Sequence, residues 1–377
     1  MKIFDVIDAE IYGESHSPEI GVVVRGIPDG TVIDTAAVQR FADRRKSGKY
    51  LFSTPRREAD EIVWDSGLNA LPDGRYEVCG DIKAHIVNAD IRPADYSYLV
   101  TPRPSHADYV STVRDGGSAA ASGGGRFSGR MTAPLTIAGG IAEQMLAERG
   151  IYVKAYIGEL AGVKGRGYGD GLPSLEEIDE CLNRPLPMLS ETERAAKAAT
   201  AAAKEGDSVG GVAECIVYGM PAGIGDSLFG GLESKISAAV YAVPAVKGVE
   251  FGAGFAISAM RGSTANDPFA MKDGKVVTLS NNSGGINGGI SNGMPVTLRA
   301  AFRPTPSISL PQRTVNLADG TETVISVKGR HDVTFVPRAL AAVESATALA
   351  VLDEILKAEI SLKGIAENDT HNKNNKI

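Results

Sequence analysis

The sequence is poor in the features that mark secreted, membrane and metal-binding proteins. Its 377 residues include three cysteines, Cys79, Cys181 and Cys215, none of them in a CxxC pair. Their number and spacing favour reduced thiols over disulfides or a zinc site. No apolar run approaches the roughly 20 residues that a membrane helix needs, and acidic residues occupy the N-terminal segment where a signal peptide would have its apolar core. These absences predict a cytoplasmic protein that does not enter membranes.

Positive charge and aromatic residues are also scarce. The chain has 39 Lys and Arg against 46 Asp and Glu, a formal net charge of −7, and 6% aromatic residues. This composition argues against the binding of nucleic acids or anionic membranes. The chain lacks a P-loop, the GxSxG elbow of serine hydrolases and the HExxH motif of zinc peptidases. A GxGxxG motif between a strand and a helix is missing too, which makes an NAD(P)-linked oxidoreductase a weaker interpretation.

Apolar spacing and capping residues predict a mixed α+β chain. Helices are expected at 34–45, 134–149, 190–205, 227–242 and 338–360. Strands are expected at 20–25, 75–88, 151–157, 211–218, 248–259 and 295–302. The spacing of Ser190 and Glu193 indicates a capping box, and Pro337 precedes the last helix, which carries one apolar face. The polar residues 364–377 lack periodicity, and we expect them to form a disordered tail.

A long-period repeat links two parts of the chain. GESHSPEIGVVVRGIPDG, from Gly13, aligns without a gap with GDSVGGVAECIVYGMPAG, from Gly206, at an offset of 206 − 13 = 193 residues. Each copy predicts a loop, a strand, a G-x-P-x-G turn and a helix, which indicates related halves at about 1–190 and 191–363. Two glycine-rich stretches can also align by composition alone. The second copy has Val209 where the first has His16, so the scaffold does not require an imidazole, and this favours a chemical role for His16.

Basic residues gather in one segment of this acidic chain. Residues 40–57 include Arg40, Arg44, Arg45, Lys46, Lys49, Arg56 and Arg57, against the single acid Asp43. Such a segment is either a solvated helix face or a site for a multiply anionic ligand, because arginine binds carboxylate and phosphate through two parallel hydrogen bonds. Further arginines beside Gly, Pro or Ser favour the ligand site: Arg103, Arg126, Arg130, Arg303 and Arg330.

Three of the five histidines lie in loop-like motifs, namely His16 in GESHS, His106 in RPSHAD and His331 in GRHD. His85 lies in an expected strand, where a structural role is the simpler interpretation, and His371 lies in the tail. An imidazole near an arginine cluster can give or take a proton near neutral pH. The residues therefore suggest acid–base chemistry on a small polyanion.

As an ordered set, the motifs resemble the chorismate synthase family. The resemblance covers residues from about 10 to 360, through GESHS, GIPDG, DRRKSG, STPRRE, RPSHADY, GGGRFSGR, GDSVGG, GMPAG, VPAVKGVEFG, RGS, NNSGGINGGIS, RPTPSI and GRHD. It implies one large α+β domain, with helices sandwiched between antiparallel sheets and a βαβ-type pseudo-repeat, assembled as a homotetramer. It also implies a lyase of the shikimate pathway of aromatic amino-acid biosynthesis. This lyase uses reduced FMN to eliminate phosphate and a ring hydrogen, in the anti 1,4 sense, from 5-enolpyruvylshikimate 3-phosphate, giving chorismate.

The resemblance also implies roles for individual residues. His16 would protonate the departing phosphate, His106 would stabilise the anionic reduced flavin, and Asp332 would help take the ring proton by way of the flavin. Substrate anions would be held by Arg45, Arg103 and Arg130. The flavin would be contacted by Arg126, Phe127, Ser128, Pro244, Ala245, Gly288, Arg303, Pro304, Thr305, Pro306, Ser307 and Arg330. Some family members reduce their own flavin with NADPH, but the sequence adds no recognisable reductase module, so an external flavin reductant is expected.

Several residues differ from those that the family motifs usually contain. Ser17, Ser105 and Phe127 replace small residues, Met131 replaces a glutamate, Leu51 replaces a basic residue for which Lys49 could substitute, and Arg303 replaces a lysine. The proton-handling groups are all kept, so the lyase is the first interpretation. A diverged flavin- or anion-binding paralogue with weak or no turnover is the alternative, and Phe127 and Leu51 are its best support.

Overall fold

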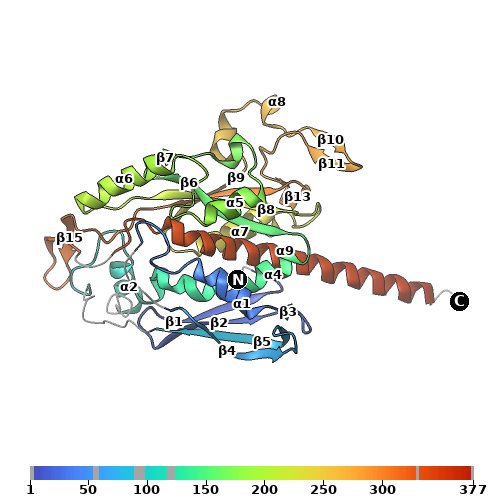
Figure 1. The fold of residues 1–377 in the computed structure, drawn as a ribbon, viewed down its shortest axis with the longest axis horizontal. Helices are drawn as coiled ribbons and strands as arrows, with labels where there is room; N and C mark the ends of the chain where they lie inside the picture. The colour runs from blue at the N-terminus through green and yellow to red at the C-terminus, as the bar shows by residue number, and fades with distance from the viewer. Residues whose placement is uncertain (1–3, 54–58, 89–97, 117–123, 328–330, 375–377) are drawn as a thin grey trace.

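Two antiparallel sheets enclose a layer of helices (Figure 1), which confirms the fold class that the motifs implied. The computed structural model describes residues 4–53, 59–88, 98–116, 124–327 and 331–374. The first sheet has the order β1-β2-β5-β3, with β4 paired to β5, and the second has the order β7-β6-β8-β14-β9. In both sheets the described strand pairings are antiparallel.

The strands of the first sheet are β1 (Asp8–Gly13), β2 (Glu19–Arg25), β3 (Val32–Ile33), β4 (Ile62–Ala70) and β5 (Tyr76–Val87). Those of the second are β6 (Tyr152–Leu160), β7 (Val163–Lys164), β8 (Gly211–Tyr218), β9 (Val246–Phe251) and β14 (Val296–Phe302). The helices between them are α1 (Thr35–Asp43), α4 (Thr132–Ala147), α7 (Leu232–Tyr241) and α9 (Val336–Asn374). Helix α4 packs on β2, β5 and α9, while α9 packs on α7, β6 and β8.

Outside this sandwich lie shorter helices and hairpins. They are α2 (Asp108–Asp115), α5 (Leu175–Leu182), α6 (Thr192–Glu205), α8 (Gly262–Ala265) and the hairpins β10–β11 (Phe269–Lys272, Lys275–Thr278), β12–β13 (Ile286–Asn287, Ile290–Ser291) and β15–β16 (Gln312–Asn316, Thr321–Ile325). Single 3₁₀ turns precede α4 at Gly125–Phe127 and Gly129–Met131. Among the described residues, no helix is both long enough and apolar enough to cross a lipid bilayer.

Helix α9 is the centre of the core. The sequence predicts one apolar face, but residues 339–356 are buried on every side, as expected of a helix enclosed by two sheets. Its buried acids are paired: Glu344 accepts hydrogen bonds from both terminal nitrogens of Arg44, at 2.5 and 2.8 Å, and from the backbone N–H of Ala155. Asp353 accepts three backbone N–H groups of residues 5–7. The helix therefore fixes α1, β6 and the N-terminal segment together.

The C-terminal end of α9 projects beyond the sandwich and continues to Asn374 (Figure 1). The polar composition of residues 364–377 predicts a disordered tail there, so the described helix is longer than expected. An isolated helical end without packing is only marginally stable in water.

The two copies of the sequence repeat each contribute a strand to a different sheet. Strand β2 lies in the first sheet and β8 in the second, and each is followed by a glycine with positive φ, Gly26 at +82° and Gly219 at +74°. A Cβ on Gly26 would lie 2.1 Å from the carbonyl oxygen of Val6, and one on Gly219 would lie 2.1 Å from that of Gly150. The same close backbone approach thus recurs in both copies. The division into halves at about residue 190 stays a prediction.

Three local expectations were wrong. Ser190 does not cap α6: its hydroxyl accepts the backbone N–H of Arg166, and Glu191 at φ +59° precedes the helix instead. Residues 254–259 form a 3₁₀ helix rather than the end of a strand, because Gly252 and Gly254 turn the chain with positive φ. Helix 227–242 begins only at residue 232, after a 3₁₀ turn.

Candidate active site

A cavity of about 660 Å³ lies where loops from both parts of the chain meet the N-terminal end of α9. Its volume falls within the roughly 300–1,000 Å³ of small-molecule sites. Of the residues singled out in the sequence it is lined by His16, His106, Asp332, Arg45, Arg103, Arg130, Arg126, Phe127, Ser128, Pro244, Ala245, Arg303, Thr305, Pro306 and Ser307. Gly288 and Pro304 do not line it, and Arg56, Arg57 and Arg330 lie outside the described residues.

The cavity wall is strongly cationic. Its described lining includes the side chains of Arg45, Arg103, Arg126, Arg130, Lys247, Arg303 and Arg338, against a single carboxylate, that of Asp332. Such a wall suits a ligand that carries several carboxylate or phosphate groups. Of residues 40–53, the described part of the basic segment, Arg45 and Ser47 line the cavity. Arg44 pairs with buried Glu344 and Lys46 pairs with Asp43, so part of that segment is structural.

His16 lies in the short loop between β1 and β2. The hydroxyl oxygen of Ser17 lies 2.8 and 2.5 Å from the backbone carbonyl oxygens of Glu14 and Glu19, to either of which it can donate. The side-chain amide of Asn88 donates to the carbonyls of Glu14 and Ser17. The backbone N–H of Ser15 donates to Gly125 O, which brings the loop to the segment before α4. The Ser15 hydroxyl lies 2.9 Å from Nδ1 of His16. Ser17, which departs from the family pattern, therefore holds the loop that presents this imidazole.

His106 and Arg103 share one buried carboxylate, that of Asp108 in the first turn of α2. Asp108 is 1% exposed, and it accepts hydrogen bonds from Nε and an Nη of Arg103, both at 2.8 Å, while His106 Nδ1 lies 2.7 Å from it. Arg103 also donates to Ser307 and lies over the ring of Tyr98. Burial alone would raise the pKa of Asp108, but hydrogen bonds from Arg103 and His106 outweigh it and hold the pKa well below its ordinary value.

Ser105, the residue before His106, differs from the family motif and has a strained backbone conformation. Ser105 has φ +59°, a left-handed conformation that glycine adopts at no steric cost and that costs another residue about 1–2 kcal/mol. Its carbonyl accepts a hydrogen bond from the guanidinium of Arg303. This contact links the His106 loop to the segment at residues 303–307, where several flavin contacts were expected.

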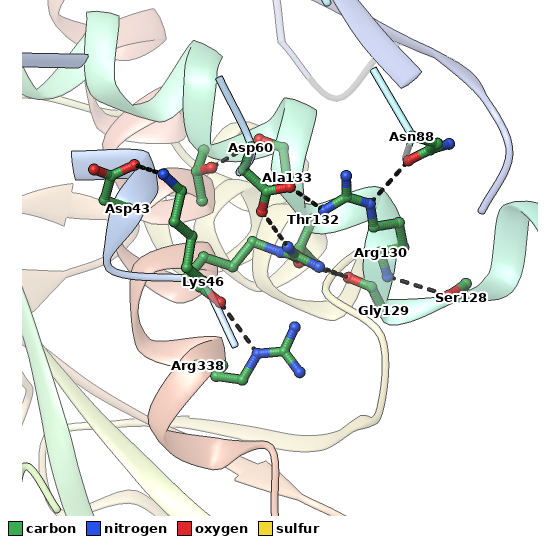
Figure 2. A network of polar contacts seen from close by, with 12 residues as sticks. Asp43, Lys46, Asp60, Asn88, Ser128, Gly129, Arg130, Thr132, Ala133 and Arg338 are labelled. Carbon is green, nitrogen blue, oxygen red and sulfur yellow. Dashed lines mark hydrogen bonds and ion pairs between the residues drawn. The ribbon is translucent and has the colours of Figure 1, made fainter. Parts of the chain in front are cut away.

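Arg45 follows α1, Arg130 precedes α4, and both line the cavity. Figure 2 shows the contacts of Arg130 with Asp60 and Asn88. Arg45 donates to the hydroxyl of Thr132 at 2.8 Å and to the carbonyl of Gly129 at 3.1 Å. Arg130 donates from Nε to the side-chain oxygen of Asn88 at 3.1 Å. Both arginines are nearly buried, at 4% and 9% exposure, so their guanidinium planes are held by the protein.

Asp332 is the last residue of the GRHD motif and faces Arg338 in the first turn of α9. The carboxylate accepts two hydrogen bonds from one Nη of Arg338, at 3.0 and 3.2 Å. The same arginine donates from Nε to the backbone carbonyl of Arg45 at 3.1 Å. Arg338 therefore joins the Asp332 loop to the arginine pair across the cavity. His331, beside Asp332, also lines the cavity.

Sequence reasoning missed three of these residues. Asp108 lies two positions after His106 inside the RPSHADY motif, Lys247 lies in VPAVKGVEFG, and Arg338 follows Pro337. Each of them lies inside or beside one of the family motifs. Their charge, in a segment that is otherwise apolar or rich in small residues, was the signal that could have marked them as site residues. Leu51 replaces a basic residue of the family, and Lys49 was expected to be able to substitute for it. Neither residue lines the cavity.

The fold defines an α+β protein, and its cavity is lined by many cationic side chains and one described carboxylate. Residues 7–356 match the family described as chorismate synthase. The chain is 42% identical over 363 residues to the chorismate synthase of Dehalococcoides mccartyi (strain BAV1), covering 95% of this chain and 96% of that protein. It is 41% identical over 361 residues to that of Thermococcus kodakarensis, covering 93% and 96%.

A solved structure described as chorismate synthase superposes with a TM-score of 0.74 at 21% identity, covering 94% of this chain and 93% of that one. That likeness supports the fold. The family match and the curated relatives carry the assignment: the chain belongs to the chorismate synthase family.

Proposed function

We propose that this protein is a lyase that eliminates phosphate from 5-enolpyruvylshikimate 3-phosphate, in the anti 1,4 sense, to give chorismate. The observation that carries the proposal is the convergence of His16, His106 and a set of guanidiniums on one cavity of about 660 Å³. The substrate has two carboxylates and one phosphate, and a wall with one acid and many cations suits such a polyanion. The names of the relatives support the same reaction.

His16 is proposed as the acid that protonates the departing phosphate. Its Nδ1 lies at hydrogen-bond distance from the Ser15 hydroxyl, so Nε2 is the nitrogen at which a proton would pass to the phosphate. Arg45, Arg103 and Arg130 are proposed to hold the anionic groups of the substrate. All three are at least nine-tenths buried, so they need little reordering when the substrate binds.

Reduced FMN is the cofactor that we propose for the same cavity. The donor chemistry fits: Arg126 and Arg303 could hold a phosphate, and Phe127, Ser128, Pro244, Ala245, Thr305, Pro306 and Ser307 offer apolar and small contacts for a ring. When bound, the cofactor would supply an electron to the allylic system and recover it. We also propose Gly288, Pro304 and Arg330 as flavin contacts. In this single chain, Gly288 and Pro304 do not line the cavity.

His106 and Asp332 are proposed to act next to that cofactor. The carboxylate of Asp108 lies 2.7 Å from Nδ1 of His106 and can accept a proton-bearing Nδ1, so that in the imidazolium form the N–H at Nε2 would face the anionic ring. Arg338 orients the carboxylate of Asp332, which would help take the ring proton of the substrate.

A homotetramer is proposed from the outward-facing apolar side chains of residues 228–279. Leu228 and Phe229 are 84% and 95% exposed, Phe255 is 86% exposed, and Phe269 and Leu279 are 68% and 73% exposed. Patches of this kind mark protein–protein contacts. The backbone beside Gly288 contacts the loop that carries Leu228 and Phe229, so this flavin contact would lie at such an interface. We also propose a cytoplasmic location and an external flavin reductant.

The function is tested with purified protein, chemically reduced FMN and the phosphate ester under anaerobic conditions, following chorismate by its absorbance. Product formation supports the lyase. Tight binding of flavin and substrate without product at any flavin concentration would favour the alternative, a diverged flavin- or anion-binding paralogue, for which Phe127 in the cavity wall is the specific observation.

The two imidazoles are tested separately. His16→Ala and His106→Ala should each lower kcat by roughly 10²–10⁴, the usual contribution of an acid–base group, with an unchanged melting temperature. Wild-type turnover in either variant would remove the role assigned to that histidine.

A further inference from the structure

Asp60 is a buried carboxylate that no step above uses. It lies just before β4 and is 5% exposed, and it does not line the cavity. One carboxylate oxygen lies 2.5 Å from an Nη of Arg130, and the other lies 3.3 Å from an Nη of Arg45 (Figure 2). The same carboxylate therefore bridges the two arginines, both of which line the cavity.

We propose that Asp60 is a positioning residue that presents Arg45 and Arg130 as a fixed pair to the anionic groups of the substrate. This inference rests on the proposed function of the cavity. Two neighbouring guanidiniums repel each other, and a carboxylate between them offsets one charge and fixes both planes through charge-assisted hydrogen bonds. The trio keeps a net charge of +1, so the wall still attracts an anion.

The other hydrogen bonds of Arg45 and Arg130 help to fix the orientation of each guanidinium. Arg45 is tied to Thr132 and Gly129, and Arg130 is tied to Asn88. These neutral acceptors hold one edge of each guanidinium, while Asp60 supplies one anionic partner that both arginines share. Without Asp60 the two cations would separate, and the substrate would have to draw them together, which lowers the rate of a step that depends on exact placement.

Asp60 has an unfavourable backbone conformation, and neighbouring hydrogen bonds hold it there. Its φ is +48°, a left-handed conformation that Asp and Asn tolerate better than other side chains. The side chain of Gln39 donates to the carbonyl of Asp60 at 3.0 Å and accepts the backbone N–H of Ile62 at 2.9 Å, which fixes this turn. Asp60→Asn therefore keeps the shape and the backbone, removes the charge, and turns one of the two acceptor oxygens into a donor.

The test compares Asp60→Asn with Asp179→Asn. Asp179 pairs with Lys154, its side chain is 56% exposed, and it does not line the cavity, so it is a paired carboxylate away from the site. We expect Asp60→Asn to lower kcat by roughly 10–100-fold and to weaken substrate binding several-fold, measured by calorimetry without reductant, while flavin affinity is unchanged. Asp179→Asn should stay within twofold on all three measurements. Wild-type kcat and substrate affinity in Asp60→Asn would overturn the proposal.

A double-mutant cycle separates positioning from a merely structural role. If Asp60 acts through Arg130, the substitution Asp60→Asn should have a much smaller effect on substrate affinity in an Arg130→Gln background, less than about threefold, because interacting residues are non-additive. Fully additive effects, or an equal loss of flavin binding in Asp60→Asn, would contradict the proposal. The cycle is read on substrate affinity, so it decides the role of Asp60 even if the wild-type protein makes no chorismate, a result that would instead refute the proposed function.

Discussion

Asp108 is the residue whose replacement tests the geometry of the site most stringently, because it supports a histidine and an arginine at once. Its carboxylate accepts from the backbone N–H of Arg103 at 3.0 Å, from two side-chain nitrogens of Arg103 at 2.8 Å each, and pairs with His106 Nδ1 at 2.7 Å. Asp108→Asn keeps the size of the side chain. It removes the negative charge and turns one acceptor into a donor, so at least one cationic donor then faces another donor.

The expected loss of stability in Asp108→Asn follows from the burial of the ion pair between Arg103 and Asp108. The side chains of Arg103 and Asp108 are 3% and 0% exposed, and removing one partner of a buried ion pair costs about 3–5 kcal/mol because the other charge is left uncompensated. We therefore predict that the free energy of unfolding falls by about 3–5 kcal/mol. The imidazole of His106 also loses the carboxylate beside its Nδ1, so kcat should fall by roughly 10²–10⁴.

The pH dependence gives an independent check with a defined sign. Because the folded-state pKa of Asp108 lies below its ordinary value of 3.8, its contribution to stability is fully present above about pH 5 and is lost as the pH falls below about 4. The difference in unfolding free energy between the wild-type protein and Asp108→Asn should therefore shrink as the pH falls below about 4.

The assay is urea denaturation across this pH range, followed by anaerobic turnover of the folded variant. Asp179→Asn is the control, since Asp179 pairs with Lys154 at the surface with its side chain 56% exposed, and such pairs contribute about 0–1 kcal/mol. If Asp108→Asn unfolds like the wild-type protein and keeps its kcat, the reasoning about this carboxylate is refuted.

Two further predictions concern the scaffold. Gly219→Ala should lower the unfolding free energy by about 2–4 kcal/mol, because a Cβ there would lie 2.1 Å from a carbonyl oxygen. Gly223→Ala, with φ +93° and no atom within 4 Å of its Cβ, should cost only about 1 kcal/mol; equal losses in urea denaturation would contradict this. Asp353→Ala should cost about 3 kcal/mol or more, since three backbone N–H groups lose their acceptor, with kcat of the folded variant unchanged. A loss below 1 kcal/mol would contradict the role given to Asp353.

Regular elements with strong periodicity were predictable from the sequence, and elements set by tertiary contacts were not. Strands β2, β5, β8 and β14 lie within a residue or so of their predicted bounds. The burial of α9 on every side could not be read from its pattern, because Glu344 and Asp353 look like a polar face until their buried partners are known. The predicted capping box at Ser190 was wrong because the hydroxyl of Ser190 accepts a hydrogen bond from the backbone N–H of Arg166, which is distant in the sequence.

The candidate site was predictable as a set of residues but not as a geometry. His16, His106 and the arginines stand in recognisable loop motifs, whereas the bridging role of Asp60 joins residues that lie 15 and 70 positions away. No local pattern encodes such a contact. Asp108 was within reach, because it lies two residues from His106, but the motif alone does not show that its side chain turns back to both neighbours.

We propose that the imidazoles and guanidiniums of this cavity turn over a polyanion beside a flavin that is not consumed. This is measured by the yield of chorismate per FMN in an anaerobic mixture of protein, reduced FMN and excess phosphate ester, with the flavin spectrum recorded throughout. We expect many molecules of chorismate per flavin and a flavin that is still reduced at the end. Product limited to one molecule per flavin with matching flavin oxidation, or no product despite binding of both ligands, would contradict it.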